Sequence, residues 1–406
     1  MRSHALDPMA ADAASGSPSS AVPTQTLTFR PRIALADESL RPTRAEIDLD
    51  AIAHNLGVLR RLAAPAKVLA VVKADAYGHG VVPVARRLEA DGVDGFGVAL
   101  AEEGLELREA GVRAPILVLN GVYGGAHADV LEAGLWPVVY DLAQIEAFDR
   151  AAPDRRYRVH VKIDTGMARL GVPMRQLDAF LDGLARHPRC VVAGVMTHLS
   201  SADTDREATF EQLARFDRAL DAIRAAGHRP ELVHASNTAA TLGEPAGRYD
   251  MVRPGGALYG ISFGLAEGAS LRPALRLRTE VIALRELEPG DPVGYDRTYR
   301  CVRRTRVATV PVGYGDGLPR ELSNRGVMLL RGMRCPIVGR VSMDLTMLDV
   351  TDVEGAAIGD EVVVLGEQRT ATGTYARIDA DEVARTAGTI AYDVLTSVSR
   401  RVPRSY

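Results

Sequence analysis

The sequence predicts an α/β protein in which an N-terminal (β/α)8 barrel of the TIM type is followed by a C-terminal all-β domain. Two observations predict this architecture. Eight short apolar runs alternate with amphipathic stretches up to about residue 274, and past residue 275 the pattern changes to closely spaced runs in which apolar and polar residues alternate. A barrel of this type takes about 250 residues, which fits the first part of the chain.

The eight candidate strands are short apolar segments, with about 20 to 40 residues from the start of one to the start of the next. The stretches between them are amphipathic, and two of these, residues 81–92 and 208–227, end at a glycine suited to a helix C-terminus. Strands and helices that alternate in this way form repeated βα units around a parallel sheet. The candidate strands are residues 68–72, 96–100, 116–120, 136–140, 157–164, 191–198, 231–236 and 249–256.

We expect three segments along the chain. Residues 1–38 are rich in Ala, Ser, Pro and Asp and show no periodicity, which predicts a disordered leader. Residues 39–274 should form the barrel, and residues 275–406 should form the β-rich domain. The pattern of this last segment does not decide between a small barrel and a sandwich.

Composition narrows the class of partner. The chain has 49 Lys and Arg against 52 Asp and Glu, so its net charge of -3 gives no electrostatic case for nucleic acid or an anionic membrane and favours a small molecule. No apolar run approaches the roughly 18 residues of a membrane span, and the N-terminus lacks the apolar stretch of a signal peptide, so we expect a cytoplasmic protein. The three cysteines, Cys190, Cys301 and Cys335, fit neither a disulfide framework nor a zinc site, and we expect no metal.

Polar side chains end several of the predicted strands. In a (β/α)8 barrel the active site lies at the C-terminal ends of the strands, so these residues should share one rim. Polar residues at five strand ends together favour a functional site over isolated surface charges. They are Lys73, Lys162 with Asp164, His198, Ser236 with Asn237, and Arg253 with Gly255 and Gly256.

Lys73 suggests covalent chemistry. An amine partly buried behind Val71 and Val72 should lose proton affinity through desolvation, and a neutral amine forms a Schiff base. The glycines and hydroxyls at the seventh and eighth strand ends expose backbone N–H groups, where barrels commonly hold a phosphate. A reactive lysine facing a phosphate site suggests the cofactor pyridoxal 5'-phosphate.

Nine motifs in order along the chain resemble the alanine racemase family, whose members combine a barrel with a β domain. The resemblance runs from about residue 42 to residue 403, and nine ordered matches are far more specific than any one of them. The motifs are "AVVKADAYGHG", "VKIDTGMARLG", "GVMTHLSSAD", "HASNTAAT", "MVRPGGALYG", "VGYDRTY", "VPVGYGDG", "GRVSMDLTMLDV" and "TIAYDVLTSVSRRVPR". One departure is Ala168, which stands where glycine is frequent in the family.

The resemblance implies pyridoxal 5'-phosphate as cofactor and assigns residues to it. Lys73 would hold the cofactor covalently, Arg253 would face its pyridine nitrogen, and His198 would link Arg253 towards Tyr295. The tyrosines would contribute hydroxyls to the phosphate site. The phosphate would be surrounded by Tyr77, Thr238, Gly255, Gly256 and Tyr392.

The resemblance also implies racemisation of alanine by two bases, supplying D-alanine for peptidoglycan. Lys73 would be the base specific for the D enantiomer and Tyr295 the base specific for the L enantiomer, because inversion at Cα needs a proton removed on one face and returned on the other. His198 and Arg253 would supply the positive charge that favours the phenolate of Tyr295.

The substrate pocket and the assembly follow from the same resemblance. Arg169 would bind the substrate carboxylate or the cofactor's phenolic oxygen, oriented by Lys162, which is carbamylated in several relatives. Met343 and Asp344 of a second subunit would close the pocket together with Tyr314. We therefore expect a homodimer with shared active sites.

Of three alternative functions, one stays open and the sequence argues against the other two. A racemase of broader specificity, acting on serine, lysine or arginine, would use the same two bases. A decarboxylase of basic amino acids would need a cysteine motif followed by an acid, which is absent near Cys301 and Cys335. A non-catalytic cofactor-binding barrel of one domain is excluded by the length of the β-rich segment.

Overall fold

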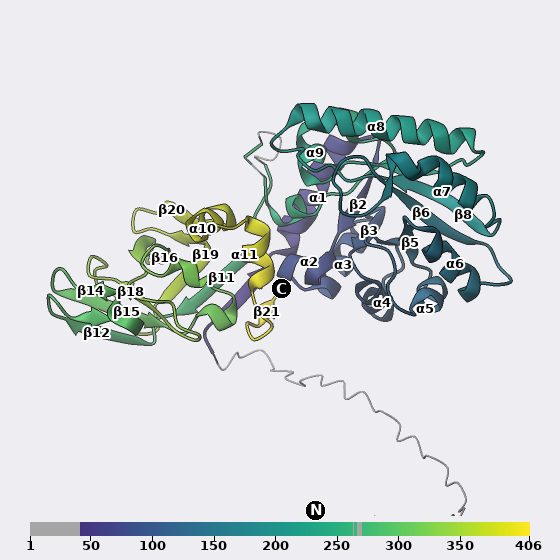
Figure 1. Ribbon diagram of the computed structural model, residues 1–406. Coiled ribbons are helices and arrows are strands. Elements are labelled where there is room, and N and C mark those ends of the chain that lie inside the picture. Colours follow the sequence, from purple (N-terminus) through teal and green to yellow (C-terminus); the bar gives the residue numbers. More distant parts are fainter. Residues whose placement is uncertain (1–40, 263, 266–269) are drawn as a thin grey trace, which may run out of the picture. The chain divides into compact units, whose positions relative to one another are not determined.

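The computed structural model describes residues 41–262, 264, 265 and 270–406 (Figure 1). The leader expected at residues 1–38 lies outside the described residues, and the boundaries at residues 38 and 274 stay predictions. Within the described part of the chain, none of the helices combines the length and apolar character needed to span a bilayer. The same residues contain no group of three or more His, Cys, Asp or Glu that could hold a metal ion.

Eight parallel strands form the barrel and confirm the eight predicted segments. They follow the order β10-β2-β3-β4-β5-β6-β8-β9, and a short β7 (Val172–Pro173) also pairs with β6. Backbone hydrogen bonds from Asp250 to Val233 (3.0 Å) and from Arg253 to Ser236 (2.9 Å) join the last strand to β9 and close the ring. The strands are β2 (Lys67–Val71), β3 (Gly95–Val98), β4 (Ile116–Val118), β5 (Trp136–Val139), β6 (Tyr157–Asp164), β8 (Cys190–Met196), β9 (Leu232–His234) and β10 (Met251–Val252).

Helices connect the strands, and the two helical stretches predicted from the sequence are confirmed as α3 and α8. The Asp205 side chain caps α8 by accepting from Ala208 N–H, and its buried residues recur at the spacing of one helical face, from Leu213 through Phe216 to Leu220. α8 packs along the outside of the barrel (Figure 1). The helices of this part are α1 (Leu49–Ala63), α2 (Lys73–Gly78), α3 (Val81–Ala90), α4 (Ala101–Glu109), α5 (His127–Glu132), α6 (Leu142–Ala151), α7 (Leu177–Leu184), α8 (Arg206–Ala225) and α9 (Thr238–Gly243).

A small apolar cluster fills the inside of the barrel. Its five buried members come from five different strands, and side chains of such strands meet only in the barrel interior. This part of the interior is therefore a packed apolar core. The members are Leu69, Leu117, Val138, Met196 and Met251.

The C-terminal part is mostly β. Its largest sheet has the order β17-β16-β19-β11-β1-β21, with β20 paired to β19, and smaller sheets have the order β12-β15-β18 and β13-β14. The sheet includes β1, which precedes the barrel in sequence and pairs antiparallel with β11 and parallel with β21. The strands are β1 (Arg44–Ile47), β11 (Leu275–Glu280), β12 (Ala283–Leu287), β13 (Pro292–Val293), β14 (Tyr299–Arg300), β15 (Thr305–Val310), β16 (Val327–Leu330), β17 (Met333–Pro336), β18 (Thr346–Asp349), β19 (Glu361–Arg369), β20 (Tyr375–Ile378) and β21 (Arg404–Ser405).

Two helices, α10 (Ala380–Ala387) and α11 (Ala391–Ser397), interrupt the β pattern that the sequence predicted. Asp379 caps α10 by accepting from Glu382 N–H, and Gly388 ends it in a left-handed conformation with a φ of 78°. α11 packs on α2 of the barrel and so brings C-terminal side chains to the predicted site.

Candidate active site

The predicted strand-end residues lie at one rim of the barrel. Lys73 follows β2 by two residues, His198 follows β8 by two, and Arg253 comes directly after β10. Two other strand-end residues bind backbone instead of facing the site, because the Ser236 hydroxyl donates to Gly247 O (2.7 Å) and the Asn237 side chain caps α9.

Lys73 stands at the start of a left-handed turn. The next four residues, Ala74 to Tyr77, all have φ between 52° and 54° and ψ between 40° and 53°. A left-handed helical conformation costs roughly 1–2 kcal/mol for each non-glycine residue, so this segment stores backbone strain. This conformation is not predictable from the local residues, since these four positions contain no glycine.

The environment of Lys73 lowers the proton affinity of its amine, as predicted. Burial lowers the pKa of Lys73, and the Arg169 guanidinium lowers it further. The Glu103 carboxylate acts in the opposite direction. Glu103 also accepts a hydrogen bond from Ala74 N–H (2.6 Å), so it fixes the peptide next to the lysine. Sequence reasoning missed Glu103, because it lies in the first turn of α4 and not at the end of a strand.

Three hydroxyls and two glycines converge beside Lys73. A Cβ added to Gly255 would lie 2.3 Å from the Tyr77 hydroxyl, and one added to Gly256 would lie 2.7 Å from the Tyr392 hydroxyl. Gly255 N–H donates to Thr238 Oγ1 (2.8 Å). All five predicted phosphate-site residues are therefore together, and a Cβ at either glycine would displace a tyrosine hydroxyl.

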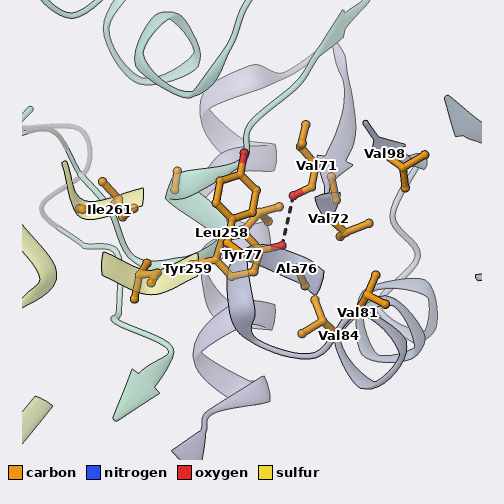
Figure 2. Packing of buried hydrophobic residues seen from close by; sticks show 14 of the residues in the cluster. Val71, Val72, Ala76, Tyr77, Val81, Val84, Val98, Leu258, Tyr259 and Ile261 are labelled. Atoms are coloured by element: carbon orange, nitrogen blue, oxygen red, sulfur yellow. Dashed lines mark hydrogen bonds between the residues drawn. The ribbon is translucent and has the colours of Figure 1, made fainter. Parts of the chain in front are cut away.

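The aromatic rings of this cluster pack on one another. Tyr77 lies 5.0 Å from Tyr259 and 5.5 Å from Tyr392, measured between ring centroids. Figure 2 shows Tyr77 and Tyr259 among the apolar side chains, with the Tyr259 hydroxyl donating to Val71 O (3.1 Å). Burial raises the pKa of Tyr77 and raises that of Tyr392 to about 12, so both hydroxyls stay protonated and are able to donate.

Arg253 is a buried cation that is fixed in position. Its Nη2 donates to Thr197 O (2.7 Å) and Ala235 O (2.9 Å), and its Nη1 donates to His234 Nδ1 (3.0 Å). No carboxylate is among its hydrogen-bond partners in the described residues. Burial lowers the pKa of Arg253 to about 9, which still leaves it charged at neutral pH.

Two histidines support Arg253 and were missed by the sequence analysis. His234 must carry its proton on Nε2, because its Nδ1 accepts from Arg253, and this Nε2–H donates to His160 Nδ1 (2.9 Å). Gly194 leaves room for His160, since a Cβ there would lie 2.3 Å from His160 Nδ1. Both histidines lie inside apolar strand patterns, where they read as core positions.

The prediction that His198 supplies positive charge is wrong. Burial, together with Arg253 and other nearby cations, lowers the pKa of His198 well below its usual value, so this imidazole is neutral. Its contact with Arg253 is long, at 3.4 Å between His198 Nδ1 and Arg253 Nη2. Of the two predicted sources of positive charge, only Arg253 remains.

Cations outnumber carboxylates at the rim. Lys162 is 4% exposed, and burial followed by the charges of Arg253 and Arg169 lowers its pKa to about 8. Asp164 is one of the few carboxylates there, and its Oδ1 already accepts from the N–H groups of residues 166–168, in the turn that leads to Arg169. This rim is therefore built to receive anions.

Four predicted site residues of the C-terminal part lie on a separate surface. Tyr295 is 69% exposed and opens a groove lined only by residues between 285 and 347. The segment of Tyr314 binds that of Met343 through the backbone, because Tyr314 N–H donates to Ser342 O (3.0 Å) and Gly315 N–H donates to Met343 O (2.9 Å). Asp344 accepts from Arg401 Nη2 (2.6 Å). No hydrogen bond in the described residues joins Tyr295 to the barrel rim.

The rim residues fit pyridoxal 5'-phosphate. The hydroxyls and N–H groups around Gly255 and Gly256 suit a phosphate, the lysine suits an aldehyde, and the buried arginine without a carboxylate suits a ring nitrogen that accepts a hydrogen bond. The fold and this site define the class of pyridoxal-phosphate-dependent barrel enzymes that carry an additional β domain.

Comparison with known proteins specifies the family. Residues 47–263 match the family model of the alanine racemase N-terminal domain, and residues 274–406 match that of the alanine racemase C-terminal domain. The chain belongs to the alanine racemase family, whose members depend on pyridoxal phosphate.

Individual relatives agree with this assignment. An alanine racemase of Sorangium cellulosum is 50% identical over 377 residues, which cover 90% of this chain and 99% of the relative. The biosynthetic alanine racemase of Pseudomonas aeruginosa has a TM-score of 0.82 at 37% identity, covering 90% of this chain and 99% of that one. The enzyme of Bartonella henselae, solved with covalently bound pyridoxal phosphate, has a TM-score of 0.81 at 30% identity, with the same coverages.

Proposed function

We propose that this chain interconverts L-alanine and D-alanine and so supplies D-alanine for peptidoglycan. The observation that carries the proposal is the lysine of lowered pKa beside the hydroxyl and glycine cluster, in a chain of the alanine racemase family. The established family makes the reaction an isomerisation at Cα that depends on pyridoxal 5'-phosphate.

Residues of the barrel rim would hold the cofactor. Lys73 would bind it covalently, and Arg253 would donate to its ring nitrogen. Its phosphate would lie against the hydroxyls of Tyr77, Thr238 and Tyr392 and the backbone of Gly255 and Gly256. When bound, the cofactor withdraws electrons from the substrate and so acidifies the Cα–H bond.

Two side chains would move the proton. Lys73 Nζ would take or return the proton on the face that leads to D-alanine, and Tyr295 Oη would do so on the opposite face. Lowered proton affinity at Lys73 supports its part in this exchange.

Other side chains would bind and orient the substrate. Arg169 would bind the alanine carboxylate or the cofactor's phenolic oxygen, and Lys162 would orient Arg169. Carbamylation of Lys162 would turn a buried amine among cations into an anion, and the low pKa of Lys162 supports this, since a neutral amine is the form that reacts with carbon dioxide. Tyr314, Met343 and Asp344 would close the pocket.

A homodimer would complete the site. Tyr295 and Met343 are exposed, at 69% and 52%, on a surface with no barrel residue in the groove beside Tyr295. A second copy of the chain would bring this surface to the rim that carries Lys73. The cytoplasmic location expected from the sequence stays a prediction, and fractionation of cells with an antibody to the chain tests it.

The test is incubation of the purified chain, loaded with pyridoxal 5'-phosphate, with L-alanine in deuterated water. We expect loss of optical rotation together with deuterium at Cα, and much slower turnover of serine, lysine and arginine. Comparable turnover of those amino acids would favour the broader racemase, release of carbon dioxide would indicate a decarboxylase, and bound cofactor without exchange would indicate a binding protein.

A variant pair tests the two bases. Tyr295→Phe should lower proton removal from L-alanine by about 100-fold or more, and far more than removal from D-alanine, because one positioned base typically contributes that much. Tyr299→Phe, on the neighbouring strand β14, is the matched control and should behave like the wild type. Equal losses on both enantiomers in Tyr295→Phe would refute the assignment.

A further inference from the structure

His79 lies directly beyond the strained turn, and the proposed function gives it no task. The side chain is fully buried, and its ring lies 4.5 Å from that of Tyr259. Its Nδ1 is 3.0 Å from Ala76 O and 2.9 Å from Tyr77 O. Carbonyl oxygens only accept hydrogen bonds, so Nδ1 must carry the proton and donate to both.

This assignment leaves the other ring nitrogen bare. His79 Nε2 is buried and has no hydrogen-bond partner among the described residues. An unpaired buried acceptor costs roughly 1–3 kcal/mol, so packing alone would favour an apolar residue at this position. The Nδ1–H contact must therefore offset that penalty.

The bonded carbonyls belong to the turn itself. They are the last two carbonyls of the left-handed segment that begins after Lys73 and ends at Tyr77. In a right-handed turn these carbonyls would point elsewhere, and Tyr77 would leave its place at Gly255. A donor at Nδ1 that serves both carbonyls favours the left-handed form directly.

The flanking backbone restricts the turn from its other side. Gly78 and Gly80 have φ of 82° and 88°, and a Cβ on Gly80 would lie 1.8 Å from the Tyr406 hydroxyl. Arg404 Nε donates to Gly78 O (3.2 Å). These contacts fix where the turn ends.

Inside the turn, Gly80 N–H donates to Asp75 O (2.9 Å) and His79 N–H donates to Ala76 O (3.1 Å). Among the described residues, His79 provides the one side-chain donor to carbonyls of the turn, through Nδ1.

We propose that His79 is a positioning residue, whose Nδ1–H holds the left-handed turn that sets Lys73 and Tyr77 in place for the cofactor. The inference rests on the proposed function for the roles of Lys73 and Tyr77. His79 itself touches neither substrate nor cofactor. The turn requires one hydrogen-bond donor at the position of Nδ1.

Two substitutions separate the donor from the bulk of the side chain. In His79→Asn the amide nitrogen takes the place of Nδ1 and keeps the donor, and in His79→Leu the side chain keeps much of its volume without a donor. The matched control is His187→Leu, which removes a histidine hydrogen bond to Asp149 (2.6 Å) that the site does not use.

Binding of pyridoxal 5'-phosphate to each full-length variant, measured by equilibrium dialysis, is the first readout. We expect His79→Leu to bind about 10- to 100-fold more weakly than the wild type, which is the effect of losing one or two buried hydrogen bonds. His79→Asn should stay within about threefold of the wild type, and His187→Leu should lose thermal stability without losing affinity. Equal affinity in His79→Leu and wild type, or equal weakening in both His79 variants, would overturn the inference.

A second readout does not need the cofactor. In the wild-type chain with 15N-labelled histidine, the resonance missing from His79→Asn should report protonated Nδ1 and bare Nε2 at neutral pH. Protonation at Nε2 would contradict the inference even if His79→Leu fails to fold. A wild-type chain that binds no pyridoxal 5'-phosphate would instead refute the proposed function and leave the tautomer result standing.

Discussion

Ala168 holds a left-handed conformation, with a φ of 55°, in the turn that carries Arg169. Its N–H donates to Asp164 Oδ1 (3.1 Å), and this hydrogen bond holds the turn although alanine disfavours the left-handed conformation. Replacement by glycine removes the steric penalty, and Ala168→Gly should raise the free energy of unfolding by about 0.5–1 kcal/mol despite the larger backbone entropy of glycine. Urea denaturation of the two proteins measures the difference.

The control for this prediction is an alanine in a right-handed helix. Ala222 lies near the end of α8, where glycine should lower the free energy of unfolding by about 1 kcal/mol. Opposite signs for Ala168→Gly and Ala222→Gly show that the left-handed backbone decides the outcome. A loss of stability in both variants would mean that the turn at Ala168 does not carry strain in solution.

Single residues also show what the sequence could and could not reveal about the site. Lys73 and Arg253 were found because each follows a recognisable apolar strand in a barrel. Glu103 and His234 were missed, since their importance comes from side chains that are distant in sequence, namely the Ala74 amide and the Arg253 guanidinium. The neutral state of His198 depends on burial, which a strand-end position does not reveal.

At the scale of elements, the short helical turn η3 (Gly256–Tyr259) fits between the hydroxyls of α2 and α11 because its first residue, Gly256, and the preceding Gly255 lack side chains. Gly256→Ala would place a methyl group 2.7 Å from the Tyr392 hydroxyl, and either α11 or the turn would have to move. We expect about tenfold or greater loss of affinity for pyridoxal 5'-phosphate, measured by dialysis, with a smaller loss of thermal stability.

The matched change is Gly125→Ala, at a glycine where an added Cβ meets no atom within 4 Å and φ lies outside the positive range. This variant should bind pyridoxal 5'-phosphate like the wild type. Unchanged affinity in Gly256→Ala would show that the cofactor phosphate does not use this turn.

Elements differ in how far local sequence determines them. The eight barrel strands were predictable because each buried strand is a short apolar run followed by an amphipathic helix. β1 was not, since its partners in β11 and β21 lie about 230 and 360 residues away and its own four residues carry no distinctive pattern. α10 and α11 were missed because the surrounding β pattern dominated the interpretation, although Asp379 and Gly388 are ordinary helix-cap residues.

At the scale of the whole molecule, burial keeps a group of histidines neutral. Desolvation lowers the pKa of His79 to about 4 and that of His160 to about 3, and lowers those of His198 and His234 well below 6.5. The unfolded chain therefore binds more protons than the folded one below pH 6.5. The free energy of unfolding should fall as pH drops from about 6.5 to about 4, by at most about 1.4 kcal/mol per pH unit for each histidine.

Urea denaturation between pH 7.5 and pH 4.5 measures this slope. In His79→Asn the dependence of the free energy of unfolding on pH should be smaller by the contribution of about one proton. The variant has no imidazole at this position to protonate on unfolding. A free energy that stays constant from pH 6.5 to pH 5 would mean that these histidines take up protons without unfolding.

The proposed homodimer makes a quantitative prediction about mixtures of inactive chains. If each site takes Lys73 from one chain and Tyr295 from the other, a hybrid of Lys73→Ala and Tyr295→Phe contains one intact site and one that lacks both groups. Equal amounts of the two variants, allowed to exchange subunits, should recover about a quarter of wild-type racemase activity, since about half of the dimers are hybrids. Hybrids isolated through two different tags should have about half of the wild-type activity, since one of their two sites is intact.

The control is a mixture of Lys73→Ala with the double variant, which contains no intact site. This mixture should stay inactive, which controls for partial activity of the single variants. If Lys73 and Tyr295 of one chain act together, no mixture gains activity, and the shared-site assembly would have to be abandoned.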